Sequence, residues 1–307
     1  MLEPEEERVM KMVLEEGIMK TKMIVEGNQE VKFTTEEYQR LHQYPSFTTS
    51  VDVFLTCILQ AIVITHTGFL KDLLRAWKRA SIQRYFLSKL IVDAIQQVAI
   101  DVVLPSFVDK HDALLLRELI LMWSNYKLMT KWLCKFFESI DRHFVPKICY
   151  CSLTDISNKS FHDLVFKDFY VKFQDVALSL INQERMGLHI DCSSLKNVFL
   201  VFMEMHKHTG ITYYEGFESV MLEQTSSYYC QMAQQWLSHG SPADYVQKVY
   251  WCLEQEAERA GRYFPSGTQP KLLKVVKQQL VYDILDKLVE KQRPENCSFV
   301  TDFYQVW

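Results

Sequence analysis

Glycine and proline are scarce in this sequence, which has 9 Gly and 8 Pro among its 307 residues. Typical usage is roughly 7% Gly and 5% Pro, and a β-sandwich or barrel needs these residues in its many turns. Long helices need few turns. Because 48% of the residues are hydrophobic and 13% are aromatic, the chain can still bury a sizeable core. The composition therefore favours an all-α protein.

A long apolar run and a basic leader are also lacking. The most apolar stretch, Val53 to Ile64, is shorter than the roughly 18 residues that a membrane-spanning helix requires, and Gln60 interrupts it. The first ten residues, MLEPEEERVM, are acidic, whereas secretory signals begin with basic residues and transit peptides contain few acidic ones. We therefore expect an intracellular protein, cytoplasmic or nuclear or both, with no membrane partner.

An excess of positive charge is absent as well. The formal net charge is -4, so no overall positive field attracts phosphates, and we expect no nucleic-acid partner. The basic stretch from Arg75 to Arg84 contains Lys78 and Arg79 beside Trp77, a mixture that nucleic-acid and membrane surfaces also use. A solvated helix face is the simpler interpretation of this stretch.

No pattern in the sequence indicates a catalytic or metal site. Neither a Gly-x-Ser-x-Gly elbow nor a Gly-rich phosphate loop occurs. Cys149 and Cys151 could join Cys192, His206 and His208 around zinc, but structural zinc sites use paired Cys-x2-4-Cys knuckles, which are missing. We expect reduced thiols, no catalytic residues, no metal, no cofactor and no enzymatic activity.

Helical periodicity dominates what is present. Leu195, Val198, Phe199, Phe202 and Met203 fall at i, i+3, i+4, i+7 and i+8, which makes one apolar stripe on a helix. Such a stripe needs a partner helix, so we predict helical bundles. The same spacing recurs in three further sets: Leu115, Leu116, Leu119, Ile120 and Trp123; Trp132, Leu133, Phe136, Phe137, Ile140 and Phe144; and Phe161, Leu164, Val165, Phe169, Phe173, Val176 and Leu180.

Capping residues and prolines mark helix boundaries. The sequence Ser241-Pro242-Ala243-Asp244 provides a cap, a first-turn proline and a carboxylate at a helix start, and Thr34 to Glu37 fits a capping box. Pro146 should end a helix and be followed by a polar loop from Lys147 to Ser160. A second break is predicted from Phe264 to Pro270. The segments between these breaks have the size of small multi-helix units.

Many short motifs follow one another in a specific order from Val103 to about Leu280, and a further match touches Glu16 to Tyr38. The motifs are Val103-Leu-Pro-Ser, Lys110-His-Asp, Leu116-Arg-Glu-Leu, Met122-Trp-Ser-Asn, Trp132-Leu, Phe136-Phe137, Asp141-Arg142-His143-Phe144, Phe161-His-Asp-Leu-Val, Asn182-Gln-Glu-Arg185, Ile190-Asp, Leu195-Lys-Asn-Val, Tyr213-Tyr-Glu-Gly-Phe-Glu218, Thr225-Ser-Ser-Tyr-Tyr229, Pro242-Ala-Asp-Tyr245, Cys252-Leu-Glu and Pro270-Lys-Leu-Leu273. Together they resemble the N-terminal region of the cullins, most closely the plant cullins of the SCF type.

The resemblance implies serial multi-helix bundles, the cullin repeats, which form an elongated stalk. It places a first repeat at residues 1–146, within which 46–97 is divergent, a second at 147–264 and an incomplete third at 265–307. In cullins the first repeat binds a BTB-fold adaptor of the Skp type, which carries an F-box protein. Because the sequence ends at Trp307, the resemblance implies that the RING-recruiting half is absent and that no RING partner binds.

The resemblance also locates the adaptor-binding surface on the second and fifth helices of the first repeat. These correspond to Glu36–Leu41 and Tyr126–Phe144, which we expect to lie side by side. The residues that the resemblance assigns to adaptor contact are Tyr38, Leu41, His42, Ser139 and Arg142.

Two departures from the family pattern weaken this surface. Pro45 costs roughly 3 kcal/mol in a helix interior, so the second helix should end early. Ser139 stands where cullins commonly have a tyrosine, which removes an aromatic anchor. In addition, the β-branched stretch within 46–84 leaves the local preference open between helix and strand.

We therefore expect an interaction protein of the SCF-type ubiquitin ligase pathway that binds an Skp-type adaptor or competes for it. The alternative is a structural helical-repeat protein, or a truncated product, that has lost these contacts. The alternative predicts exposed apolar surface at Leu280, Ile284 and Leu288, which would lack a complete bundle. Enzymatic activity is the third and weakest hypothesis, and a metal assay that finds stoichiometric bound zinc would support it.

Overall fold

The computed structural model describes residues 91–136 and 151–284, together with residues 12, 16, 19, 20, 23, 26, 27, 34, 89, 287 and 288. In this part of the chain every regular element is a helix and no strand occurs, which confirms the all-α prediction. The chain divides into two compact units, Met1–Phe173 and Gln174–Trp307. The repeat boundaries predicted at residues 146 and 264 stay a prediction, and residues 46–84 lie outside the described part.

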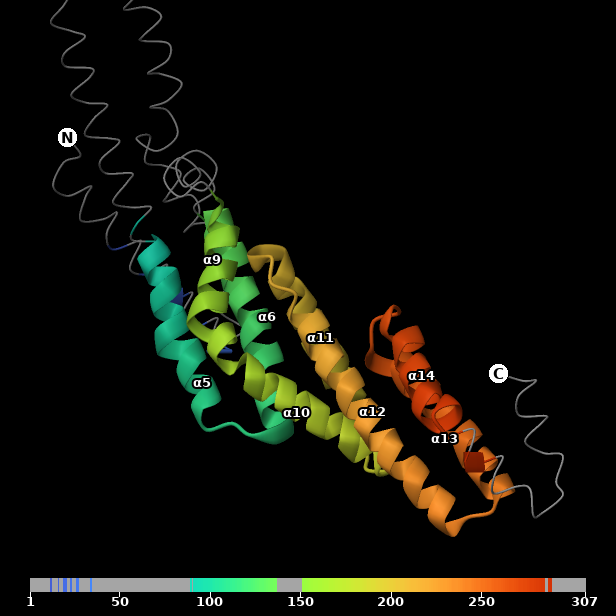
Figure 1. Ribbon diagram of the computed structural model, residues 1–307. Helices are drawn as coiled ribbons and strands as arrows, with labels where there is room; N and C mark the ends of the chain where they lie inside the picture. Colours follow the sequence, from blue (N-terminus) through green and yellow to red (C-terminus); the bar gives the residue numbers. More distant parts are fainter. Residues whose placement is uncertain are drawn as a thin grey trace, which may run out of the picture. The chain divides into compact units, whose positions relative to one another are not determined.

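Three helical runs account for most of the described part of the first unit (Figure 1). The first run is helical over residues 91–98 and continues through the π-turn η1 (Ala99–Val103) into α5 (Leu104–Val108). The second run is α6 (Asp112–Phe136). The third is α9 (Leu153–Phe161), which continues through the π-turn η2 (His162–Phe166) into α10 (Lys167–Arg185). Within this unit α9 packs against α6, and η2 packs against η1.

Aromatic side chains fill the core of the first unit. Trp123 and Tyr126 of α6 place their ring centroids 4.8 and 5.2 Å from the ring of Phe161 on α9. All three side chains are buried. The Tyr126 hydroxyl donates a hydrogen bond to the carbonyl of Ile95, 3.2 Å away, so the polar end of the buried ring has a partner. These contacts hold the three helical runs together.

The start of α9 corrects the loop predicted from Lys147 to Ser160. The α-helix begins at Leu153, because Ser152 and Asp155 form a reciprocal capping box. The Ser152 side chain accepts a hydrogen bond from the Asp155 amide at 3.2 Å, and the Asp155 carboxylate accepts one from the Ser152 amide at 3.1 Å. Residues 152–160 of the predicted loop are therefore the cap and the first turns of a helix, and residues 147–150 lie outside the described part.

The described part of the second unit contains four helices besides the end of α10: α11 (Cys192–Thr209), α12 (Tyr213–His239), α13 (Pro242–Tyr263) and α14 (Thr268–Lys277). A third π-turn, η3 (Gln278–Tyr282), continues α14. Figure 1 shows these helices in yellow to red, and α11 and α14 each pack against both α12 and α13. This arrangement confirms that the stripe predicted on α11 faces partner helices, whereas most of the stripe predicted from Trp132 to Phe144 lies outside the described residues.

The apolar face of α11 is wider than its sequence stripe. Four of the five predicted residues are buried, whereas Met203 is only half-buried. Val201 and Met205 join the core instead. Because α11 contacts α12 and α13 at once, a broader arc of its surface is covered than a single partner helix would cover.

Both ends of α13 follow the predicted signals. Ser241 caps the helix by accepting a hydrogen bond from the Asp244 amide at 3.2 Å, and Pro242 is the first helical residue. The helix ends at Tyr263, which confirms the predicted break. That break is shorter than predicted, since α14 begins at Thr268 and therefore includes Pro270 in its first turn. A proline is tolerated there because the first-turn amides have no intrahelical acceptor.

The apolar residues after α14 are buried, so the exposure predicted by the alternative hypothesis is wrong. Leu280, Ile284 and Leu288 are 0%, 5% and 0% exposed. η3 packs against α12, and the Tyr245 hydroxyl of α13 donates to the carbonyl of Leu280 at 2.8 Å. These packing partners cover the surface that the alternative leaves open.

One helical stretch in the described part, Ile91–Val108, is long and apolar enough to cross a membrane by length and composition alone. A core helix passes the same test, and this one buries Ile91, Ile95 and Phe107. Asp93 and Asp101 lie on its exposed side. A third of the stretch, 33%, is buried in the core, whereas Ile100 and Val108 are exposed.

Candidate functional site

The residues assigned to adaptor contact lie outside the part of the chain that the structure describes. This holds for all five of them, so the predicted grip between the second and fifth helices stays a prediction. Of the two segments expected to lie side by side, the structure describes only residues 126–136, which form the end of α6. The residues are Tyr38, Leu41, His42, Ser139 and Arg142.

The end of α6 has one buried and one accessible side. Tyr126 is 0% exposed and Leu133 is buried, so neither can meet a partner. Leu128 is 38% exposed, and Trp132 is half-buried with the Lys135 ammonium 5.4 Å from its ring centroid. Any partner of this helix would therefore contact the side that carries Leu128 and Trp132.

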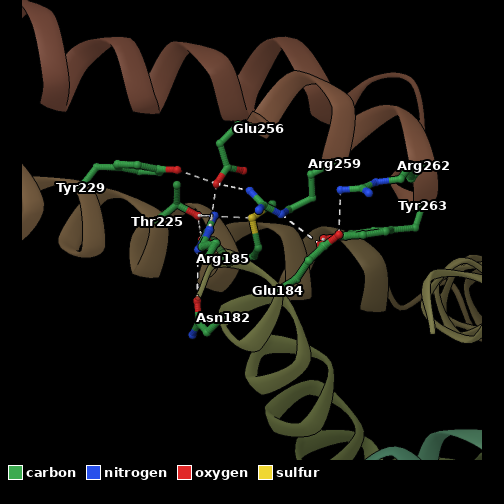
Figure 2. A network of polar contacts seen from close by, with 10 residues as sticks. Asn182, Glu184, Arg185, Thr225, Tyr229, Glu256, Arg259, Arg262 and Tyr263 are labelled. Atoms are coloured by element: carbon green, nitrogen blue, oxygen red, sulfur yellow. Dashed lines mark hydrogen bonds and ion pairs between the residues drawn. The ribbon is translucent and has the colours of Figure 1, made fainter. Parts of the chain in front are cut away.

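A buried network of charged side chains lies in the described part of the second unit (Figure 2). At its centre the Glu256 side chain of α13 is 0% exposed. Its Oε1 accepts hydrogen bonds from Arg185 Nε at 2.9 Å and from the Tyr229 hydroxyl at 2.7 Å, and it pairs with Arg259 Nη1 at 2.6 Å. Donors from α10, α12 and α13 thus converge on one carboxylate oxygen.

Glu184, the neighbour of Arg185 on α10, extends the network along α13. Its Oε2 accepts from Arg259 Nε at 3.0 Å and from the Tyr263 hydroxyl at 2.8 Å. Its Oε1 pairs with Arg262 Nη2 at 2.7 Å, and the Arg262 side chain is 48% exposed. Arg259, which is 6% exposed at its side chain, therefore bridges two carboxylates in the interior.

The Arg185 guanidinium uses its remaining nitrogens as well. Nη2 donates to Thr225 Oγ1 at 2.8 Å, and Nη1 donates to Asn182 Oδ1 at 3.1 Å. The guanidinium carbon lies 5.5 and 5.8 Å from the ring centroids of Tyr228 and Tyr229. Such a planar, forked cation with aromatic neighbours is what arginine supplies and lysine does not.

The electrostatics of the network keep its ions charged and its hydroxyl and thiol groups neutral. Burial alone would raise the pKa of Glu256, but Arg185 and Arg259 outweigh it and hold that pKa below its ordinary value. Burial, reinforced by Glu256, raises the pKa of Tyr229 and raises that of the Cys252 thiol to about 11. These groups are therefore not poised to exchange protons near neutral pH.

This arrangement fixes helices and does not present reactive groups. The central carboxylate is inaccessible, and its partners come from three helices of one unit. Removing one partner of a buried ion pair costs about 3–5 kcal/mol because it leaves a charge without compensation. The network is thus a structural lock that ties the end of α10 to α12 and α13.

A smaller cluster holds the start of α14 in the same way. Glu218 of α12 accepts a hydrogen bond from Thr268 Oγ1 at 2.6 Å and pairs with Lys271 Nζ at 2.6 Å. The hydroxyls of Tyr214 and Thr268 lie 2.7 Å apart. Since Thr268 is the first residue of α14, the carboxylate also lies near the positive end of that helix.

Metal-binding groups do not gather in the described part of the chain, where no three His, Cys, Asp or Glu side chains could hold an ion together. Cys149, one member of the zinc pattern considered above, lies outside that part. The described cysteines are Cys134, Cys151, Cys192, Cys230 and Cys252, and they are in the thiol form.

Comparison with known proteins identifies the family. The model of the cullin alpha solenoid domain matches residues 83–302, which is well over half of the chain. The chain belongs to the cullin family. This assignment confirms the predicted helical-repeat class, since the described part of this cullin-family chain consists of helices.

Plant proteins are among its relatives. Putative cullin-like protein 2 of Arabidopsis thaliana is 41% identical over 204 residues, which are 66% of this chain and 53% of that protein. Cullin-1 of Oryza sativa subsp. japonica is 35% identical over 280 residues, 91% of this chain and 34% of that protein. Cullin-like protein 3 of Arabidopsis thaliana is 36% identical over 183 residues, 60% of this chain and 72% of that protein. The chain thus spans about half of the first relative and a third of the second.

The motifs that carry the cullin resemblance meet in the buried network. Residues 182–185 on α10 and 225–229 on α12 supply Arg185, Thr225 and Tyr229. Sequence reasoning missed Glu256, although a signal exists: it continues the buried series Tyr245, Val249, Cys252 on one face of α13. A charged residue on an apolar stripe predicts a buried partner.

Proposed function

We propose that this chain acts as a scaffold or interaction protein of SCF-type ubiquitin ligases, and that its N-terminal repeat binds an Skp-type BTB-fold adaptor or competes for it. The similarity to Cullin-1 of Oryza sativa supports this proposal most, because it extends over 91% of the chain, whereas the solenoid model begins at residue 83. The similarity therefore includes most of the region in which the adaptor contacts are expected.

The proposed binding surface combines two segments. Tyr38 and Leu41 supply apolar contacts from the second helix, with His42 at its end, and Arg142 follows Ser139 on the fifth. Leu128, on the accessible side of α6, lies in the same Tyr126–Phe144 segment as Ser139 and Arg142, and its exposure supports the use of this segment as a contact surface. An F-box protein would join through the adaptor.

In this proposal the chain carries out no reaction of its own, which agrees with the scaffold role of its family. We propose that it works in the cytoplasm, the nucleus or both, where its adaptor would be found. Its contribution is to hold partners and not to transform a substrate.

Calorimetric titration of the purified 307-residue chain with a cognate Skp-type adaptor tests the proposal. We expect binding at micromolar concentrations, and we expect Tyr38→Ala with Leu41→Ala to weaken it at least about tenfold, or ~1.4 kcal/mol. Ser139→Tyr should tighten binding, because it restores an aromatic anchor. Lys274→Ala, an exposed change on α14, is the matched control and should leave the affinity unchanged.

The alternative, a helical-repeat protein without adaptor contacts, makes the opposite prediction. It is favoured by Pro45 and Ser139, which depart from the family pattern. Absence of binding up to several hundred micromolar adaptor, with Ser139→Tyr still inactive and the chain cooperatively folded, would replace our proposal by this one. Equal affinities for the parent and the variant with both Tyr38→Ala and Leu41→Ala would show that the binding surface lies elsewhere on the chain.

A further inference from the structure

Trp251 lies on the outer side of α13, and its side chain is 60% exposed. The structure describes three other tryptophans, all of them buried or half-buried, namely Trp123, Trp132 and Trp236. A large apolar ring left in water is unfavourable for an isolated chain, and tryptophan is among the residues that most often dominate the binding energy of protein interfaces. Trp251 is therefore the described tryptophan that is placed to meet a partner.

Each of the other three described tryptophans has a lysine ammonium near its ring. The pairs, with the distance from the ammonium to the ring centroid, are Lys127 and Trp123 at 5.2 Å, Lys135 and Trp132 at 5.4 Å, and Lys248 and Trp236 at 5.6 Å. In such cation–π contacts the charge is attracted to the negative face of the ring. No described residue places a cation over the Trp251 ring, although Lys248 is only three positions away, because the Lys248 ammonium is directed to Trp236.

Two exposed carboxylates share the side of α13 on which Trp251 lies. Since a helix advances about 100° per residue, Glu258 lies within about 20° of Trp251 around the helix axis, and Glu254 lies within about 60°. Neither glutamate makes an ion pair or a side-chain hydrogen bond with another described residue. The nearby cation Arg262 is paired with Glu184 at 2.7 Å. This side of α13 therefore combines an aromatic ring with negative charge.

We infer that the surface formed by Trp251, Glu254 and Glu258 binds a basic segment of a partner protein, with an arginine over the indole ring. Arginine fits better than lysine, because its planar guanidinium stacks on an aromatic face and also forms forked hydrogen bonds with a carboxylate. Carboxylates repel phosphate groups, so nucleic acids and anionic membranes do not fit this surface. The rise from Trp251 to Glu258 is about 10 Å, which two arginines three positions apart span in an extended segment.

This interaction goes beyond the proposed binding of an adaptor. Trp251 belongs to the second unit, whereas the residues proposed for adaptor contact belong to the first. Exposed cation–π contacts and exposed ion pairs are each weak and are screened by salt. We therefore expect a transient association that weakens as the salt concentration rises.

Fluorescence anisotropy of a labelled twelve-residue peptide, Arg-Gly-Ser repeated four times, tests the inference when the purified 307-residue chain is titrated into it. We expect saturable binding at low salt, with a Kd between about 10 and 200 μM. Trp251→Ala should weaken binding at least about threefold, and Trp251→Phe should weaken it less, since a phenyl ring keeps part of the attraction. Glu254→Gln combined with Glu258→Gln should also weaken it at least about threefold.

Asp175→Asn combined with Glu223→Gln is the matched control. It removes two exposed carboxylates from α10 and α12 and changes the net charge by the same amount, so it should alter the affinity less than about twofold. All the side chains changed are exposed, so thermal unfolding followed by circular dichroism should be the same as for the parent. Trp251→Ala should leave the affinity for the adaptor unchanged. Failure of the chain to bind the adaptor would count against the proposed function and not against this inference.

Three results of the peptide titration would overturn the inference. They are no binding at about 0.5 mM chain, equal weakening by the control pair, and equal affinity for a peptide with glutamine in place of each arginine. Sedimentation of the parent tests a different occupant. A dimer that Trp251→Ala abolishes would show that a second copy of the chain covers this surface, and it would overturn the inference as well.

Discussion

Replacing Glu256 by glutamine tests whether the buried network is the lock that we describe. The change preserves shape and removes the negative charge on which Arg185 and Arg259 converge. Breaking a buried ion pair costs about 3–5 kcal/mol. Arg259 keeps its 3.0 Å contact with Glu184, so we expect the lower end of that range, about 3 kcal/mol, or more than a hundredfold in the folding equilibrium.

Arg262→Gln provides a matched control in the same network. Arg262 also pairs with a glutamate, Glu184, but its side chain is 48% exposed. Exposed ion pairs contribute about 0–1 kcal/mol, so this variant should lose less than about 1 kcal/mol. Urea unfolding followed by circular dichroism gives both values by linear extrapolation. Similar losses for the two variants, or a loss below about 1 kcal/mol for Glu256→Gln, would refute the reasoning.

The parent and the Glu256→Gln variant should also differ in how their free energy of unfolding depends on pH. Because the pKa of Glu256 is lowered in the folded chain, its ionised form stabilises the fold at pH values above the ordinary pKa of 4.5. That stabilisation is lost as the pH falls through the lower folded value. The difference in unfolding free energy between the parent and Glu256→Gln should therefore stay constant from about pH 8 to pH 5 and shrink below about pH 4. A difference that grows on acidification would contradict the sign.

Two further predictions concern a cap and a thiol. Ser152→Ala removes the capping box of α9 and should lower the free energy of unfolding in urea by about 1 kcal/mol. Lys159→Ala, an exposed change on the same helix, should alter that free energy by less than about 0.5 kcal/mol. Equal effects of the two substitutions would contradict the capping role. Cys252 is 5% exposed and its pKa is raised to about 11, whereas Cys151 is half-buried. A thiol-specific reagent at pH 8 should therefore label Cys151 first and Cys252 only after the protein unfolds, as followed by peptide mass spectrometry. Early labelling of Cys252 would contradict its burial.

Local signals in the sequence predicted the helices well. The cap at Ser241 and the break after Tyr263 depend on a few neighbouring residues, and the structure places both as predicted. The stripe of α11 was found because its period is α-helical. The loop predicted at residues 147–160 is wrong from Ser152 onward, because the polar residues Ser152 and Asp155 form a capping box at the start of a helix.

Features that depend on distant residues could not be predicted in this way. Arg185 and Glu256 are 71 positions apart, and each alone would be interpreted as a solvent-exposed charge. Only the fold shows that they neutralise each other in the interior.

The residues that identify the family and the residues that would bind the adaptor are different sets. Membership of the family therefore does not by itself imply adaptor binding. Arg185, Thr225 and Tyr229 belong to motifs that resemble cullins, and the structure places them in a buried lock that no partner can reach. A chain that keeps these motifs keeps the helical repeat, whether or not it binds an adaptor. Under the proposed function, adaptor binding depends instead on residues such as Tyr38 and Leu41, and we expect Ser139→Tyr to change the affinity without changing the stability.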